Sequence, residues 1–106
     1  MNHDKLVRDR VPEIIRASGR HPKCRIVSGN DLQEALLAKL LEESDELRQA
    51  DETERPEELA DLLEIVRGLA GHLGLTMSEL TQIADNKRED RGGFAQGIWL
   101  EAVEDL

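Results

Sequence analysis

The sequence predicts an all-α fold: a helical bundle of three main helices plus a short N-terminal helix, forming one domain over residues 1–106. Three observations support this prediction. Hydrophobic residues make up 39% of the chain but aromatic residues only 2%, so the core must consist mostly of Leu, Ile, Val and Ala. Apolar residues recur at the three- and four-residue spacing of one helix face. Pro and Gly stand at the ends of the periodic stretches, where helices begin and stop.

The first half of the chain contains a short helix and a long one. Pro12 suits the first turn of the short helix, and Gly19 ends it. Residues 23–27 form a short extended run that could be an edge strand, although no partner strand is evident. The long helix is expected over residues 32–51, with Asn30 or Asp31 as its N-cap. Its apolar stripe is formed by Leu32, Leu36, Leu40 and Leu47.

The second half predicts two further helices. Pro56 opens one of them, which is expected to end near Gly74. Thr76 and Glu79 have the spacing of a capping box, so the last helix should begin there and continue to about residue 89. Residues 94–100 hold both aromatic residues of the chain. We expect this apolar tail to pack on the bundle or on a second copy.

Two acidic clusters, residues 42–46 and 57–61, lie on consecutive predicted helices. Glu43 and Glu46 are three residues apart, as are Glu58 and Asp61, so each pair shares a helix face. Glu43 also falls on the apolar stripe, where a carboxylate is costly unless it is paired or metal-bound. Four converging carboxylates would suit Mg²⁺, with Mn²⁺ possible.

The alternative is that these acids form an ordinary solvated helix surface. That explanation fits Glu42, Asp45 and Glu57 well, since acids are favoured in the first turn of a helix and on exposed faces. It fits Glu43 poorly. It also fits Asp61 poorly, because Asp is a weak helix former beyond the first turn.

Basic residues near both ends of the chain are candidates for binding phosphate. Lys87 and Arg91 continue the inward stripe of the last helix, and Arg8 lies near the start of the chain with Lys5 and Arg10. Arg matches the geometry of phosphate oxygens well. The alternatives are cations that stabilise a helix C-terminus, for Lys87 and Arg91, and solvated charge near a terminus, for the N-terminal group.

Charge and composition exclude several classes of protein. The net charge of −9 argues against binding to a nucleic-acid polymer. No apolar run is long enough to cross a membrane, and the N-terminus has no signal region. Cys24 is the single cysteine, so no disulfide forms within the chain. We therefore expect a cytoplasmic protein, and a homodimer or dimer of dimers because one chain has few helices to bury both faces of the bundle.

Taken together, the acidic motifs resemble the signature of the MazG-type all-α nucleoside triphosphate pyrophosphohydrolases. The match consists of Glu42-Glu43-x-x-Glu46 followed by Glu58-x-x-Asp61. Asn86-Lys87 and then Arg91 are similar to the family's basic segment, while residues 5–12 and 91–94 look like a compact bacterial or phage branch. The resemblance covers nearly the whole chain.

The resemblance implies a Mg²⁺-dependent enzyme that cleaves a nucleoside triphosphate between its α and β phosphates, giving the monophosphate and pyrophosphate. The metal ligands would be Glu43, Glu46, Glu58 and Asp61, and Lys87 and Arg91 would bind phosphates. Glu42 or Glu46 could accept a proton from the attacking water. Three alternatives stay open: a phosphoribosyl-ATP pyrophosphohydrolase, a non-catalytic helical dimerisation module, and a protein that binds nucleotide without hydrolysing it.

Overall fold

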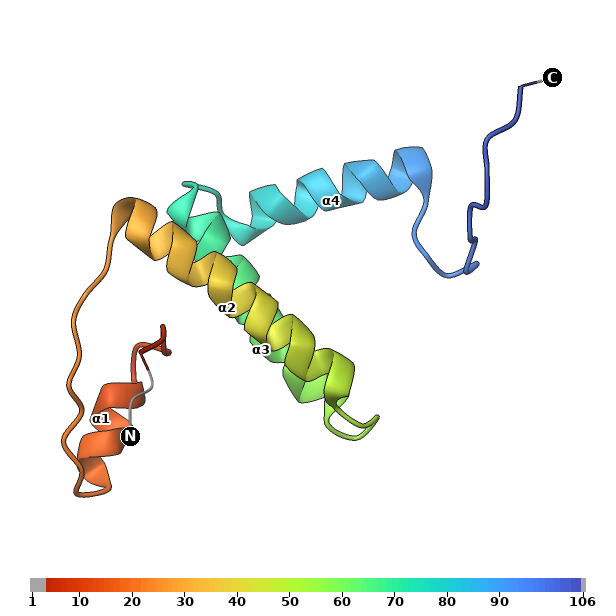
Figure 1. Cartoon of the computed structure of the whole chain (residues 1–106). Coiled ribbons are helices and arrows are strands. Elements are labelled where there is room, and N and C mark those ends of the chain that lie inside the picture. The colour runs from red at the N-terminus through yellow and green to blue at the C-terminus, as the bar shows by residue number, and fades with distance from the viewer. Residues whose placement is uncertain (1–3, 106) are drawn as a thin grey trace. The chain divides into compact units, whose positions relative to one another are not determined.

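The structure, a computed structural model, describes residues 4–105 and confirms the all-α prediction. Its four helices are α1 (Val11–Ala17), α2 (Gly29–Gln49), α3 (Arg55–His72) and α4 (Met77–Arg91) (Figure 1). Within residues 4–105 there is no strand, so the run at residues 23–27, considered as an edge strand, is irregular. The chain divides into two compact units, one ending at Gly74 and the other beginning at Leu75.

The first unit is built on a hairpin of α2 and α3, which pack side by side (Figure 1). Its buried apolar residues are few: Leu36 of α2, Ala50 at the C-cap of α2, and Ile65 and Ala70 of α3. Glu43 is buried among them. The predicted apolar stripe of α2 therefore does face α3, and the carboxylate lies on that stripe as its spacing indicated.

The start of α2 differs from the prediction. Ser28 is the N-cap residue, and the helix begins at Gly29, so the expected caps Asn30 and Asp31 lie inside the first turn. Ser28 makes no side-chain cap hydrogen bond. Asp31 instead places a negative charge in the first turn, where the helix dipole favours it.

Asp51 organises the turn between α2 and α3. Its Oδ1 atom accepts hydrogen bonds from the Thr53 hydroxyl (2.7 Å), the Thr53 amide (3.0 Å) and the Glu54 amide (3.1 Å). The Thr53 hydroxyl and the Glu54 amide lower the pKa of Asp51. Pro56 follows within the first turn of α3, where its missing N–H costs nothing. This turn joins the end of α2 to the start of α3.

In the second unit the predicted capping box of α4 is confirmed. The Thr76 amide donates to Glu79 Oε1 at 3.1 Å, and the Glu79 amide donates to Thr76 Oγ1 at 3.0 Å. The helix has no buried residue, so the expected inward face is not covered. Phe94 and Trp99 of the apolar tail are 99% and 87% exposed, and packing of this tail on a second copy stays a prediction.

α3 packs closely against Leu36 of α2 at Gly68. A Cβ atom placed there would lie 3.0 Å from Cδ2 of Leu36, whereas a Cβ atom at Gly71 meets nothing within 4 Å. We expect Gly68→Val to destabilise the protein by about 1–3 kcal/mol, because a branched side chain overpacks the contact. Gly71→Ala, the matched control, should stabilise it by up to about 1 kcal/mol through helix propensity. Urea unfolding followed by circular dichroism measures both, and equal effects would contradict the proposed close contact.

Candidate metal centre

The α2–α3 hairpin brings carboxylates of both acidic clusters together. Glu43 of α2 and Glu58 and Asp61 of α3 each offer an oxygen atom, and these three atoms lie within 4.8 Å of one another. Glu43 also forms a second group, at the same spacing, with Glu42 and Glu46 of its own helix. Glu43 is therefore the carboxylate that joins the two clusters.

The position of Glu43 follows from helix periodicity. It lies seven residues after Leu36 and seven before Ala50, both of which are buried against α3. Residues seven apart lie on nearly the same face of a helix, so Glu43 must face α3 as well. On α3, Glu58 and Asp61 precede the buried Ile65 by seven and four residues, which puts them on the face toward α2.

Burial leaves two carboxylate oxygens without partners. Glu43 is only 7% exposed, and its Oε2 atom has no hydrogen-bond partner among the described residues. The same holds for Oε2 of Glu58. Buried polar atoms are usually hydrogen-bonded, and an unsatisfied one costs about 1–3 kcal/mol. A group of carboxylate oxygens with too few neighbouring cations suits a hard divalent cation such as Mg²⁺ or Mn²⁺.

The local electrostatics agree with this deficit of positive charge. Burial raises the pKa of Glu43, and the adjacent Glu46 carboxylate raises it further, while Lys39 lowers it. Burial also raises the pKa of Glu58, followed by the repulsion of Asp61 and Glu43. In both cases the surroundings disfavour the charged carboxylate, and a bound cation would favour it instead.

Three cations of the same unit contact the carboxylates. Arg8 Nη2 lies 2.7 Å from Oδ1 of Asp61. Lys39 Nζ lies 3.5 Å from oxygens of both Glu42 and Glu43, and Lys5 Nζ lies 3.5 Å from Glu42 Oε1. The segment before α1 therefore reaches the acidic site through Lys5 and Arg8.

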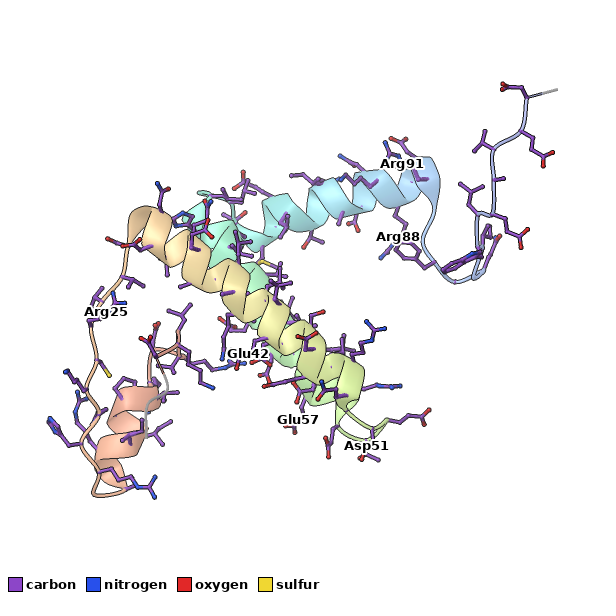
Figure 2. The ribbon with its side chains drawn as sticks, in the orientation of Figure 1. Arg25, Glu42, Asp51, Glu57, Arg88 and Arg91 are labelled. Carbon is purple, nitrogen blue, oxygen red and sulfur yellow. The ribbon has the colours of Figure 1, made fainter. Side chains whose placement is uncertain are left out.

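The predicted ligands do not all fall into one group. Glu43, Glu58 and Asp61 come together, whereas Glu46 is exposed and belongs with Glu42 and Glu43. Glu42, labelled in Figure 2, is half-buried on α2. Asp45 is exposed, and so is Glu57, labelled near the start of α3, as expected for solvated acids.

The predicted phosphate-binding residues have different settings. Arg8 contacts the predicted ligand Asp61, so it lies beside the acidic site, and its binding of phosphate stays a prediction. Lys87 and Arg91 are exposed residues of α4 and belong to the other unit (Figure 2 labels Arg91). Their part in phosphate binding stays a prediction.

Lys39 is the residue of the site that sequence reasoning missed. Its side chain is only 19% exposed, and it bridges Glu42 and Glu43. The sequence does carry a signal, since Lys39 is the one charged residue of the stretch 35–41 and precedes the acids by three and four residues. Those spacings place it beside both carboxylates on the helix surface.

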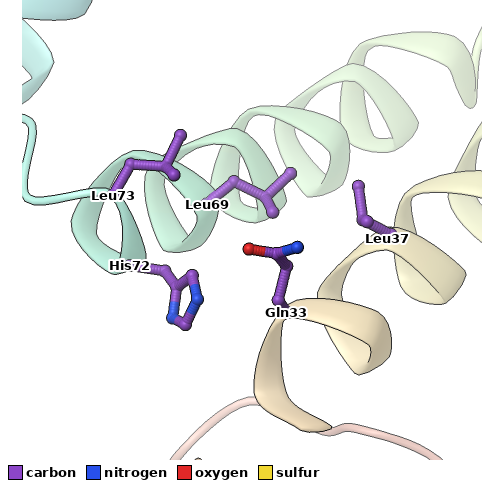
Figure 3. Close-up of a pocket in the computed structure, with 5 residues that line it drawn as sticks. All are labelled: Gln33, Leu37, Leu69, His72 and Leu73. Carbon is purple, nitrogen blue, oxygen red and sulfur yellow. The ribbon is translucent and has the colours of Figure 1, made fainter. Parts of the chain in front are cut away.

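A mostly apolar pocket of the first unit is separate from the acids. It has a volume of about 330 Å³ and lies between the beginning of α2 and the end of α3 (Figure 3). Its lining is mostly apolar: Gln33, Leu37, Leu69, His72 and Leu73. It contains no carboxylate, so the chemistry suggested by the sequence belongs to the acidic site and not to this pocket.

Comparisons with known proteins identify a similar protein, and its function is uncharacterized. No protein-family model matches the chain, and no solved structure matches it. An uncharacterized protein of Mycolicibacterium smegmatis is 60% identical over 47 residues. That alignment covers 44% of this chain and 48% of the mycobacterial protein, so the similarity spans less than half of either. Among the described residues, no helix is long and apolar enough to cross a membrane.

The pKa shifts predict how stability depends on pH in metal-free protein. A carboxyl group whose pKa is raised by folding binds its proton more tightly in the folded state. Its contribution to the free energy of unfolding therefore falls as pH rises from about 4, the ordinary range of Glu, through the raised pKa. Glu43→Gln removes this penalty, so without metal we expect the variant to melt at or above the wild-type Tm at pH 7. Near pH 4 the difference should vanish.

Bound metal should reverse the order of the Tm values of wild type and Glu43→Gln. Added Mg²⁺ or Mn²⁺ should raise the Tm of wild type and leave that of Glu43→Gln nearly unchanged, because binding to the folded state alone adds stability. Glu64→Gln is the matched control, since Glu64 lies on α3 and pairs only with Arg67 among the described residues. Thermal melts at pH 4 and 7, with EDTA or with metal, measure these effects. A wild-type Tm that does not respond to metal would count against the site.

Proposed function

We propose that the chain is a metal-dependent nucleoside triphosphate pyrophosphohydrolase of the MazG type. It would cleave between the α and β phosphates and release a nucleoside monophosphate and pyrophosphate. The observation that carries the proposal is Glu43, a buried carboxylate with an unpartnered oxygen that joins two groups of acids. A solvated helix surface gives no reason to bury a carboxylate, whereas a metal site does.

The three acids contributed by both helices are the best ligand set. Glu43, Glu58 and Asp61 are all buried or half-buried, and two of their oxygens lack partners. Glu42 and Glu46, together with Glu43, form a more exposed second set. A divalent cation would neutralise phosphate charge and lower the pKa of the attacking water.

Glu46 is the better of the two expected proton acceptors. Glu42 contacts the ammonium groups of Lys5 and Lys39, so both of its oxygens already have cationic partners. Within residues 4–105, no cation lies within ion-pair distance of Glu46, and its side chain is exposed to incoming water. Glu46 would take the proton as the water oxygen bonds to phosphorus and the bond from phosphorus to the bridging oxygen breaks.

Cationic side chains would bind the departing pyrophosphate. Arg8 already lies beside the acidic site, and Lys87 and Arg91 are the further candidates. Positive groups fixed where negative charge develops stabilise a transition state without reorganisation at the moment of reaction. Positioning and electrostatics would supply most of the rate enhancement, as is usual for phosphoryl transfer.

We further propose that the functional unit is a dimer built on the hairpin. Leu37 and Leu41 are 40% and 70% exposed on α2, while Leu59 and Leu63 are 55% and 44% exposed on α3. Each pair is four residues apart and shares a helix face. The small buried core gives this hairpin little stability of its own, and a second copy covering these leucines would add to it.

Pyrophosphate release tests the reaction. Purified full-length protein should release pyrophosphate from at least one member of a panel of standard and modified nucleoside triphosphates plus phosphoribosyl-ATP, with Mg²⁺ or Mn²⁺ and not with EDTA. Glu43→Gln and Asp61→Asn should lose about 100-fold or more in kcat, because each removes a charged ligand. Glu64→Gln should keep wild-type activity.

The panel also separates the alternatives. Release from phosphoribosyl-ATP alone would identify the biosynthetic activity. If no nucleotide of the panel releases pyrophosphate, and metal still raises the Tm of the protein, the hydrolase proposal is overturned and a binding role remains. Wild-type turnover by Glu43→Gln would overturn the assignment of the site.

Sedimentation velocity tests the dimer. Leu37→Glu combined with Leu41→Glu should convert the protein to monomers, because two charges would be buried at the contact. Ile26→Glu is the matched control, since Ile26 is 95% exposed outside the helices. A wild-type protein that sediments as a monomer at micromolar concentration would rule the dimer out.

A further inference from the structure

We propose that Lys5, Arg8 and Lys39 form the polyphosphate-binding half of the acidic site, and that they act as internal counter-ions until a divalent cation takes their place. The inference rests on the proposed function and specifies which residues of the first unit contact the phosphates. It adds Lys39 to the residues that the sequence indicated, and it retains Lys5 and Arg8 from the N-terminal group. It also assigns Arg8 a second role, toward Asp61.

The contacts of Lys39 leave it able to bind an anion. Its ammonium group has three N–H donors, and its two contacts, to Glu42 and Glu43, are both 3.5 Å long. Charge-assisted hydrogen bonds are ordinarily about 2.7–2.9 Å long, so neither contact is a full one. The side chain is nevertheless largely buried, which fixes where its charge lies. A phosphate oxygen would complete the coordination of this ammonium group.

A pocket of about 160 Å³ lies beside these ammonium groups. It is lined by Asp4, Lys5 and Leu6 of the N-terminal segment and by the face of α2 that carries Ala35, Ala38, Lys39 and Glu42, so two carboxylates lie beside its two ammonium groups. The two alanines are small, and they leave room between the segment and the helix. Lys5 and Lys39 enter from opposite walls, and both contact Glu42. The pocket thus places two positive charges next to the carboxylates.

The charge balance indicates an exchange of cations. Five carboxylates and three cations leave the fully ionised cluster with two negative charges, which one divalent cation would balance. Arg8 Nη2 lies 2.7 Å from Asp61 Oδ1, and Asp61 is one of the three acids that would bind the metal ion with Glu43 and Glu58. Metal binding would therefore weaken the contacts of Arg8 and Lys39 with the acids. The released cations would then lie beside any phosphate that the metal attracts.

This exchange predicts opposite effects on two ligands. Removing Arg8 or Lys39 takes away a competitor for the carboxylates, so divalent cations should bind more tightly. The same substitution removes a phosphate contact, so polyphosphate should bind more weakly. A residue that merely holds the fold together would weaken both, and a solvated cation would affect neither.

The test measures the two affinities separately in the full chain. Isothermal titration calorimetry gives the Kd of Mn²⁺ alone, and then the Kd of inorganic tripolyphosphate at saturating Mg²⁺. In Arg8→Gln and Lys39→Met we expect the Kd of Mn²⁺ to fall about threefold or more, and that of tripolyphosphate to rise about tenfold. Lys39→Arg should restore tripolyphosphate binding. Arg67→Gln, which breaks an ion pair with Glu64 only, should match wild type in both.

A lower Kd for Mn²⁺ together with a higher Kd for tripolyphosphate, in both variants, supports the exchange of cations. Unchanged affinities, or weaker binding of Mn²⁺ in a folded Arg8→Gln variant, overturn it, as does a wild-type protein that binds neither ligand. Arg8 is 57% exposed on its side chain, so this variant stays informative if Lys39→Met fails to fold. Opposite shifts without pyrophosphate release from any nucleotide would retain the exchange and reject the hydrolase.

Discussion

A carboxylate buried between two helices is the constraint on which the rest of this structure depends. Glu43 takes a position where the packing of α2 on α3 calls for an apolar side chain, and its Oε2 atom finds no partner among residues 4–105. The hairpin has only a few buried apolar residues, and their burial must offset this cost. An arrangement that lowers stability at the centre of a small core is typical of a site held for binding.

The chain supplies the two signs of charge from different segments. The hairpin provides the acids, because helix periodicity sets Glu43 opposite Glu58 and Asp61. The cations come from the flank of α2 and from the segment before α1, through Lys39, Lys5 and Arg8. The three cations neutralise part of the charge of the five carboxylates, so the cluster keeps a net negative charge.

Patterns within one helix were predictable from the sequence, and contacts between segments were not. The buried place of Glu43 follows from its spacing in the apolar stripe, and the Thr76 capping box follows from a local motif. Ser28 as N-cap was missed because Asn30 and Asp31 are also good capping residues. The division of the four predicted ligands into two groups depends on how α2 and α3 lie against each other, which no pattern within one helix encodes. The contact between Arg8 and Asp61 spans 53 residues, and no local pattern encodes it.

The same periodicity separates the site from the surface proposed for a second copy. Successive residues of a helix are rotated by about 100°, so on α2 the Leu37 and Leu41 flank lies on the other side of Leu36 from the Ala35, Lys39 and Glu42 flank. The first flank is apolar and exposed, and the second carries the charges and the smaller pocket. A partner that covers the leucines therefore stabilises the hairpin without closing the charged flank. The proposed dimer would therefore leave open the side of α2 on which we propose that polyphosphate binds.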